Sequence, residues 1–144
     1  MRVVLDTNII ISGLLFGGVP RKLIQLCTSR PGLAITSEAL VDELRDVLER
    51  TKFERYIKRL NRTPEDLVKD YLTYTSVIEP VHIEEGAVRD VKDTIVLEAA
   101  VGGKATYIVS GDNDLLVLRT YAGITILSAA DVLLLIETDE NDSG

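Results

Sequence analysis

Acidic residues directly follow two apolar stretches of the chain, where they could bind a metal ion. Asp6 comes after the run at residues 2–5. Asp112 and Asp114 come just after the run at residues 106–109. In open α/β sheets, ligands bind at the carboxyl ends of the strands, near the point where the strand order reverses. If these two runs are neighbouring parallel strands, three carboxylates converge at one edge of the sheet.

Two further acids lie on predicted helices near the same edge. Glu43 shares a helix ridge with Leu40 and Val47, which places it at the border of the apolar stripe. Asp93 lies in the first turn of a helix that leads directly into the strand at residues 106–109. A right-handed connection would therefore return Asp93 to this edge of the sheet.

Each acid also has a purely structural interpretation. Asp6 could cap the helix that follows it. Asp112 and Asp114 could form a turn that leads into a short helix. Glu43 could be a solvated residue at the border of its stripe. Asp93 would stabilise the first turn of its helix without any metal.

Taken as a group, the acids predict a divalent metal ion. Carboxylates gathered at one edge repel one another and raise one another's pKa unless a cation joins them. Ligation by oxygen alone suits Mg²⁺ or Mn²⁺. The single histidine, His82, fits no ligand spacing, which argues against zinc. Whether Asp90 or Asp93 faces the metal, and whether the site holds one ion or two, stays open.

The strands and helices that must position these acids alternate along the chain. Short runs rich in β-branched residues predict strands at residues 2–5, 33–36, 76–81, 106–109 and 124–127. Amphipathic stretches predict helices at residues 9–15, 20–29, 37–50, 52–60, 63–75, 90–101 and 129–136. Pro80 favours an edge position for its strand. We therefore expect an α/β fold, a three-layer α/β/α sandwich with a central parallel sheet of about five strands.

Length and composition fit one globular domain in a reducing compartment. The chain has 144 residues, 46% of them hydrophobic, which is enough for a sizeable core. The lone Cys27 excludes an internal disulfide and favours the cytoplasm. No signal peptide or membrane span is expected, because the apolar run at residues 9–16 is too short. We expect one domain at residues 1–138 and an acidic, disordered tail at residues 139–144.

Four segments together resemble a known family in their order and spacing. They are LDTNI from residue 5, SEALVDEL from residue 37, RDVKDTIVLEAAVGGKATYIVSGDNDLL from residue 89 and ITILSAADVL from residue 124. Over nearly its whole length the chain resembles the PIN domain (PilT N-terminus) family. Within that family it is similar to the small, single-domain VapC-like toxins of toxin–antitoxin pairs. The resemblance implies a Mg²⁺- or Mn²⁺-dependent endoribonuclease.

The resemblance also implies a role for each acid. The catalytic acids would be Asp6, Glu43, Asp93 and Asp112. The metal ligands would be Asp6, Asp93, Asp112 and Asp114. The supporting polar residues would be Asn8 and Ser110. Thr7 and Asn8 are also expected to cap the next helix and support the carboxylate of Asp6. A cation held here would make a bound water acidic enough to attack a phosphodiester.

RNA binding has to overcome a formal net charge of −7. Residues 50–62 hold six basic residues and a single acid, Glu54. The candidate RNA contacts, which share one helical face of this segment, are Arg55, Lys58, Arg59 and Arg62. The other interpretation is an ordinary solvated helix face. Arg21 and Lys22 are further candidates.

The resemblance also implies partners. Small PIN toxins commonly form homodimers and bind an antitoxin that blocks the cleft, so we expect a homodimer and an antitoxin protein from a neighbouring gene, with no membrane partner. A haloacid-dehalogenase-type phosphatase is rejected, because it needs an acid where this chain has Asn8. The remaining alternative is a non-catalytic PIN-like module that binds nucleic acid or protein. The complete set of acids argues against that alternative.

Overall fold

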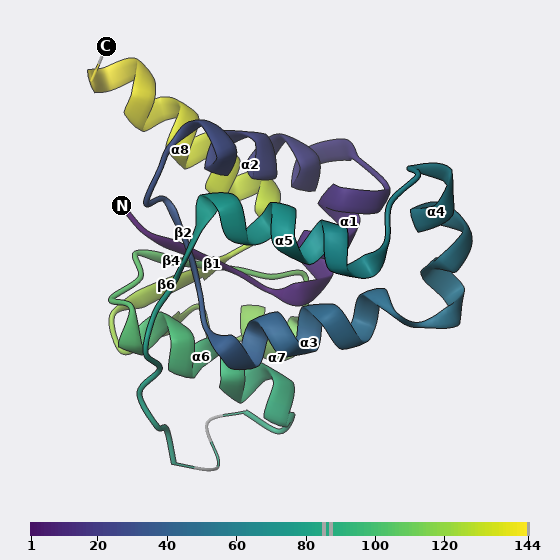
Figure 1. The fold of residues 1–144 in the computed structure, drawn as a ribbon. Helices are drawn as coiled ribbons and strands as arrows, with labels where there is room; N and C mark the ends of the chain where they lie inside the picture. The colour runs from purple at the N-terminus through teal and green to yellow at the C-terminus, as the bar shows by residue number, and fades with distance from the viewer. Residues whose placement is uncertain (85, 87, 144) are drawn as a thin grey trace.

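A mixed six-stranded sheet runs through the middle of the molecule (Figure 1). The computed structural model describes residues 1–84, 86 and 88–143, with side chains up to residue 139. The strand order is β3-β2-β1-β4-β6-β5. The strands are β1 (Val3–Leu5), β2 (Ala34–Thr36), β3 (Thr75–Val77), β4 (Tyr107–Val109), β5 (Thr120–Tyr121) and β6 (Ile124–Leu127).

The strand order reverses between β1 and β4, the two strands that the acids follow. β1 pairs in parallel with β2 on one side and with β4 on the other. Leu5 at the end of β1 lies opposite Val109 at the end of β4. The residues that follow these two strands therefore meet at one edge of the sheet, as the sequence predicts.

The two outer edges of the sheet differ from the prediction. A sixth strand, β5, pairs antiparallel with β6, where only parallel strands were expected. Ala122 (φ 51°) and Gly123 (φ 80°) join the two strands in the left-handed conformation that a tight hairpin needs. Ala122 carries no turn signal, so the hairpin was not predicted. At the opposite edge, β3 is the expected edge strand, but it ends at Val77 and Pro80 lies beyond it.

Helices cover both faces of the sheet. The 3₁₀ turn η1 (Thr51–Phe53) precedes α4, so the predicted helix at residues 52–60 is divided in two. The helices are α1 (Thr7–Leu15), α2 (Gly18–Ser29), α3 (Glu38–Leu48), α4 (Glu54–Arg59), α5 (Pro64–Tyr74), α6 (Val91–Gly102), α7 (Asn113–Leu116) and α8 (Ala129–Ser143).

Polar side chains fix the start of three helices at the residues that the sequence indicates. The Ser37 hydroxyl accepts a hydrogen bond from the first turn of α3. Thr63 and Asp66 form a reciprocal capping box at α5. The Asp90 carboxylate accepts from the N–H of Lys92 at 2.9 Å, so Asp90 caps α6. These caps set where α3 and α6 begin, and both helices carry acids of the site.

Alternate residues of the central strands contact different layers of helices. Val3 and Leu5 belong to one core, which they share with residues of α1, α2, α3, α5 and α8. Val4 belongs to a second core, which it shares with residues of α6 and α7. Figure 1 shows α2 and α8 on one side of the sheet and α6 on the other. The fold is therefore the three-layer α/β/α sandwich that the apolar strands predict.

The first two helices form a sharply bent pair. α1 and α2 meet at 96°, and the break contains Gly17 (φ 92°) and Gly18 (φ 70°). In the described part of the chain, no single helix has both the length and the apolar composition to cross a membrane. This bent pair meets those two criteria only when its helices are taken together.

The last helix extends beyond its predicted end at residue 136. α8 continues to Ser143, so the backbone of residues 139–143 is helical where the acidic composition predicted a disordered tail. Residue 144, the last of that predicted tail, lies outside the described residues. The division into residues 1–138 and 139–144 stays a prediction.

Candidate metal centre

An acidic cavity opens where β1 and β4 end. The N–H of Asp6 donates to the carbonyl oxygen of Val109 at 2.9 Å, so the two strands place their following residues side by side. The cavity has a volume of about 300 Å³. It is lined by Asp6, Thr7, Asn8, Glu43, Val47, Arg50, Lys52, Asp90, Lys92, Asp93 and Asp112.

The side chain of Asp6 does not form the standard cap of the helix that it precedes. Its backbone stands at the N-cap of α1, yet its side chain makes no capping hydrogen bond. Instead, the Ser110 hydroxyl donates to Asp6 Oδ2 at 2.7 Å, and the same hydroxyl accepts from the N–H of Asp112 at 3.0 Å. Burial raises the pKa of Asp6, and the hydrogen bond from Ser110 partly offsets this. One buried serine thus links Asp6 and Asp112, and its supporting role in the site stays a prediction.

Asp93 is a buried carboxylate that faces other carboxylates. It is 3% exposed, and its Oδ2 atom has no hydrogen-bond partner among the described residues. Burial and then the neighbouring acids Asp112 and Asp6 together raise the pKa of Asp93 to about 7. A buried, unpaired carboxylate oxygen among like charges is the arrangement that a cation would stabilise.

Three acids come close enough to share one ion. Carboxylate oxygens of Asp93, Asp112 and Asp114 lie within 4.8 Å of one another. Asp112 Oδ1 also accepts from the N–H of Asp114 at 2.9 Å, which fixes the turn into α7. The donors are all oxygens, the set that Mg²⁺ and Mn²⁺ favour. Asp6 lies in the same cavity but outside this group, so its role as a ligand stays a prediction.

The geometry distinguishes Asp90 from Asp93. Both line the cavity. The Asp90 carboxylate is used to cap α6, whereas Asp93 lies one turn further on and joins Asp112 and Asp114. Arg89 approaches the same group from outside, with its Nη2 atom 3.4 Å from Asp114 Oδ1. Asp93 is therefore the better candidate ligand.

Glu43 faces the cavity rather than the solvent. The Thr7 hydroxyl donates to Glu43 Oε2 at 3.1 Å. Burial raises the pKa of Glu43, the hydrogen bond from Thr7 opposes the rise, and the nearby charge of Asp6 adds to it. Thr7 was expected to support Asp6: a hydrogen bond from its backbone lowers the pKa of Asp6, while its hydroxyl holds Glu43. Asn8 is exposed and lines the cavity, so its supporting role stays a prediction.

Three basic residues of the cavity were not predicted as part of the site. Arg50, Lys52 and Lys92 line it together with the acids. Arg50 and Lys52 begin the basic segment at residues 50–62, which directly follows α3. This position was the sequence feature that could have placed them at the site. Lys92 lies between the two acids of the α6 start. These cations could draw a phosphate chain toward the carboxylates.

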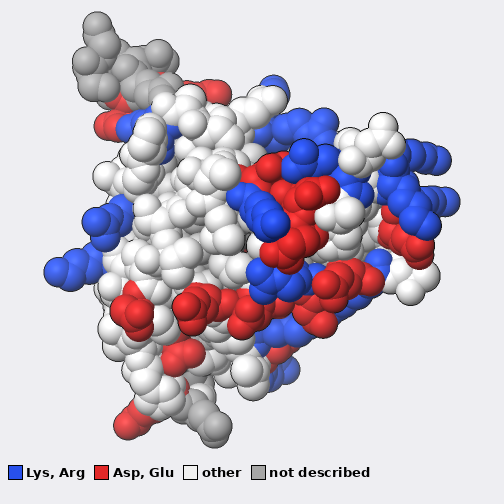
Figure 2. Space-filling view, viewed as in Figure 1, with Lys and Arg blue, Asp and Glu red and all other residues white. Residues whose placement is uncertain are grey.

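The four predicted RNA contacts lie on or next to α4, away from the cavity lining. Figure 2 shows Lys and Arg side chains gathered around α4, at the right of the view. Lys58 pairs with Glu54 at 2.7 Å, and Arg62 pairs with Asp70. Arg55 and Arg59 lie 4.9 and 6.0 Å from the Tyr56 ring. Two of the four are thus already paired with acids, and the RNA role of all four stays a prediction.

Arg21 has a structural role in the bend between α1 and α2. Its Nε atom donates to the carbonyl oxygen of Gly13 at 3.0 Å, and its Nη2 atom approaches the carbonyl oxygen of Leu14 at 3.4 Å. These bonds tie α2 to the last turns of α1. They account for Arg21 without any contact to RNA.

Comparison with known proteins covers the part of the chain that carries these acids. The family model of the PIN domain matches residues 2–114, a span that begins before β1 and ends at Asp114. No curated protein matches the sequence. PIN domains are generally nucleases and typically use a divalent metal, which fits a cluster of buried and half-buried acids at the sheet edge. With most of its length matched and the acids gathered where β1 and β4 end, the chain belongs to the PIN domain family.

Proposed function

We propose that the protein is a metal-dependent endoribonuclease that hydrolyses RNA phosphodiester bonds with Mg²⁺ or Mn²⁺. The observation that carries the proposal is the buried Asp93 carboxylate, whose Oδ2 atom has no partner among the described residues. It lies with Asp112 and Asp114 in an oxygen-only group. Without a cation this arrangement costs stability, so its presence favours a function that uses one.

In the proposed reaction, different residues have different roles. A bound cation supplies a more acidic water and stabilises negative charge on the phosphate. Asp93, Asp112 and Asp114 are the residues that would hold it, with Asp6 beside them. Ser110 keeps the Asp6 carboxylate oriented, since it donates to it at 2.7 Å.

Glu43 is placed to handle a proton. Its raised pKa makes it a better proton acceptor than an ordinary glutamate, and the Thr7 hydroxyl holds it at the cavity wall. In this scheme Glu43 takes the proton of the attacking water. Arg50, Lys52 and Lys92 hold the phosphates that flank the reacting one.

The biological setting is proposed from the resemblance to VapC-like toxins. On that basis the protein is the toxin of a toxin–antitoxin pair, forms a homodimer and is inhibited by an antitoxin from a neighbouring gene. A single, buried cysteine, Cys27, is compatible with the reducing cytoplasm. RNA rather than DNA as substrate rests on the same resemblance.

RNA cleavage tests the proposal directly. Wild type, Asp6→Asn and Asp93→Asn would be incubated with single-stranded, stem-loop and transfer RNAs, with Mg²⁺, with Mn²⁺ or with a chelator. Asp131→Asn, on the exposed surface of α8, is the matched control. We expect metal-dependent cleavage by wild type and the control, and a loss of at least about 100-fold in the two site variants.

Two results would contradict the proposal. Equal cleavage by wild type and Asp6→Asn would place the activity elsewhere or in a contaminant. No cleavage by wild type, together with no Mn²⁺ binding by calorimetry, would favour the non-catalytic binding module.

A further inference from the structure

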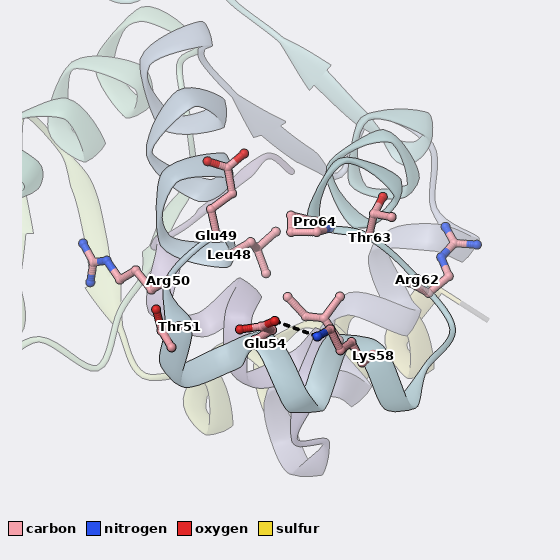
Figure 3. A pocket seen from close by; sticks show the side chains of 10 residues that line it. Leu48, Glu49, Arg50, Thr51, Glu54, Lys58, Arg62, Thr63 and Pro64 are labelled. Carbon is pink, nitrogen blue, oxygen red and sulfur yellow. Dashed lines mark hydrogen bonds and ion pairs between the residues drawn. The ribbon is translucent and has the colours of Figure 1, made fainter.

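A second hollow lies between α3, α4 and α5, next to the acidic cavity (Figure 3). Its volume is about 360 Å³, within the range of pockets that hold small organic groups. Leu48, Ile57 and Pro64 contribute an apolar floor, one residue from each helix. Leu48 and Ile57 are almost fully buried, so the floor is fixed by the packing of the three helices.

Arg50 separates the two hollows. It lines both the apolar hollow and the acidic cavity. In Figure 3 its guanidinium points away from the apolar floor. A chain whose phosphate lies beside the acids would therefore pass Arg50, and a group attached next to that phosphate could enter the apolar hollow.

The rim of the hollow carries an exposed charged pair. Lys58 Nζ donates to Glu54 Oε1 at 2.7 Å (Figure 3). Both side chains are more than half exposed and belong to the same helix, α4. Together they offer a hydrogen-bond acceptor and a donor side by side. The edge of a nucleobase presents the complementary groups.

We propose that this hollow binds the base of one nucleotide beside the cleaved phosphate and so selects the sequence that is cut. The inference rests on the proposed nuclease function. The base packs mainly on the half-buried Pro64, above Leu48 and Ile57, while Glu54 and Lys58 contact its edge. Only an unpaired base can turn into such a hollow, so the substrate is a single-stranded stretch of RNA.

An apolar side chain of a protein partner is the other possible occupant. It would fill the floor but leave Glu54 and Lys58 with no new partner. It would also make no use of Arg50 as a link to the acids. The shared arginine and the charged rim therefore favour a nucleotide.

Methyl NMR of the whole protein tests the hollow without relying on catalysis. Wild type labelled at isoleucine and leucine methyls would be titrated with the four ribonucleoside 5′-monophosphates, in the presence of a chelator. We expect at least one nucleotide to shift the Ile57 and Leu48 signals, while Ile124 and Ile126, in the core on the other side of the sheet, stay unchanged. Ribose 5-phosphate, which lacks a base, should leave Ile57 unmoved.

Two NMR results would overturn the inference. One is that no nucleotide shifts Ile57 at millimolar concentration, as expected if the occupant is a protein side chain. The other is that ribose 5-phosphate shifts it equally, which would show phosphate binding alone.

Cleavage mapping then tests selection. Wild type, Glu54→Gln and the control Glu137→Gln, on the surface of α8, would cut a single-stranded RNA with randomised positions. We expect Glu54→Gln to reduce the preference for the favoured base about tenfold, and the control to keep it. An unchanged base preference in Glu54→Gln would contradict recognition of the base by Glu54 and Lys58. If wild type neither cuts RNA nor binds Mn²⁺, the nuclease proposal fails, whereas the NMR titration still decides whether the hollow takes a base.

Discussion

Asp93 is the residue whose surroundings conflict most with its charge. Its carboxylate is buried, faces Asp112 and Asp6, and has a pKa raised from 3.8 to about 7. Because the folded state favours the protonated form, Asp93 supports folding best below about pH 4. That contribution is lost as the pH rises through 7. The metal-free protein should therefore be destabilised by this residue at neutral and alkaline pH.

Asp93→Asn should stabilise the metal-free protein at pH 8. The gain should be roughly 2–4 kcal/mol, since no charge is then buried, and it should disappear at pH 4, where wild type is protonated. Urea unfolding in a chelator at pH 4, 6 and 8 measures it, with Asp131→Asn as an exposed control. Added Mg²⁺ should stabilise wild type more than the variant. A variant less stable than wild type at every pH would refute this account.

Ser110→Ala should weaken both the fold and the site. The change leaves the carboxylate of Asp6 and the N–H of Asp112 without their shared partner, so we expect a loss of about 1–3 kcal/mol of unfolding free energy. The pKa of Asp6 should also rise, because the lost hydrogen bond lowers it. The acid limb of the cleavage profile then moves to higher pH.

The matched control for this serine is Ser29→Ala. Ser29 is exposed, and its hydroxyl donates to the carbonyl oxygen of Leu26 in its own helix. It should change neither stability nor the pH profile measurably. A pH profile of Ser110→Ala identical to that of wild type would mean that Asp6 does not titrate in the reaction.

Sequence reasoning located the acids but missed several of their partners. Asp6 and Asp112 were found because each follows a strand, and strand ends share an edge. The bond from Thr7 to Glu43 joins α1 to α3, and no spacing within one element reveals it. Similarly, Arg62, in the connection between α4 and α5, pairs with Asp70 of α5. The pattern within residues 55–62 does not reveal this ion pair.

At the scale of elements, α6 is fixed at both ends, and this places Asp93. The helix begins at its Asp90 cap and ends at Gly102, where the backbone of residues 79 and 80 passes close by. A Cβ atom added to Gly102 would lie 2.1 Å from the carbonyl oxygen of Glu79 and 2.8 Å from the Cα of Pro80. Backbone atoms cannot move aside as a side chain can, so this contact requires glycine.

Gly102→Ala should therefore destabilise the protein by about 1–3 kcal/mol. The control is Gly111→Ala, where an added Cβ meets no atom within 4 Å and which should cost less than about 1 kcal/mol. Thermal or urea unfolding of both variants decides the comparison. Equal stability of the two would show that the segment at residues 79–80 shifts freely.

The elements were largely predictable, and the exceptions have physical causes. Regular apolar spacing located most helices within a few residues of their observed ends. The hairpin of β5 and β6 was missed because Ala122 adopts a left-handed conformation that its identity does not signal. The acidic end of α8 was expected to fray, yet its backbone continues as helix to Ser143.

For the whole molecule, the central question is how a chain of net charge −7 meets a polyanion. The local arrangement answers it, since Arg50, Lys52 and Lys92 share the cavity with the acids. A cation held by the acids would further reduce their negative charge. For the proposed nuclease, attraction to RNA would then be a property of this cavity rather than of the net charge.

Lys52→Gln should raise the KM for RNA and lower the salt dependence of binding. One lost phosphate contact reduces the slope of log K against log salt by about 0.7 for a single strand. Lys104→Gln, at an exposed position after α6, is the control and should leave the slope unchanged. To avoid cleavage, RNA binding would be measured at several salt concentrations with Asp6→Asn alone and with Asp6→Asn combined with Lys52→Gln or with Lys104→Gln. The same slope in all three proteins would exclude Lys52 as a phosphate contact.

The short outer strands have a consequence for self-association. An exposed edge strand with free N–H and C=O groups can pair with another molecule and lead to aggregation. Here one edge is the three-residue β3, followed closely by Pro80, and the other is the two-residue β5. Neither edge offers a length of backbone that a second chain could extend. Association between copies of this protein, including the proposed homodimer, should therefore use helical surfaces, and the sheet should resist strand addition even when the protein is concentrated.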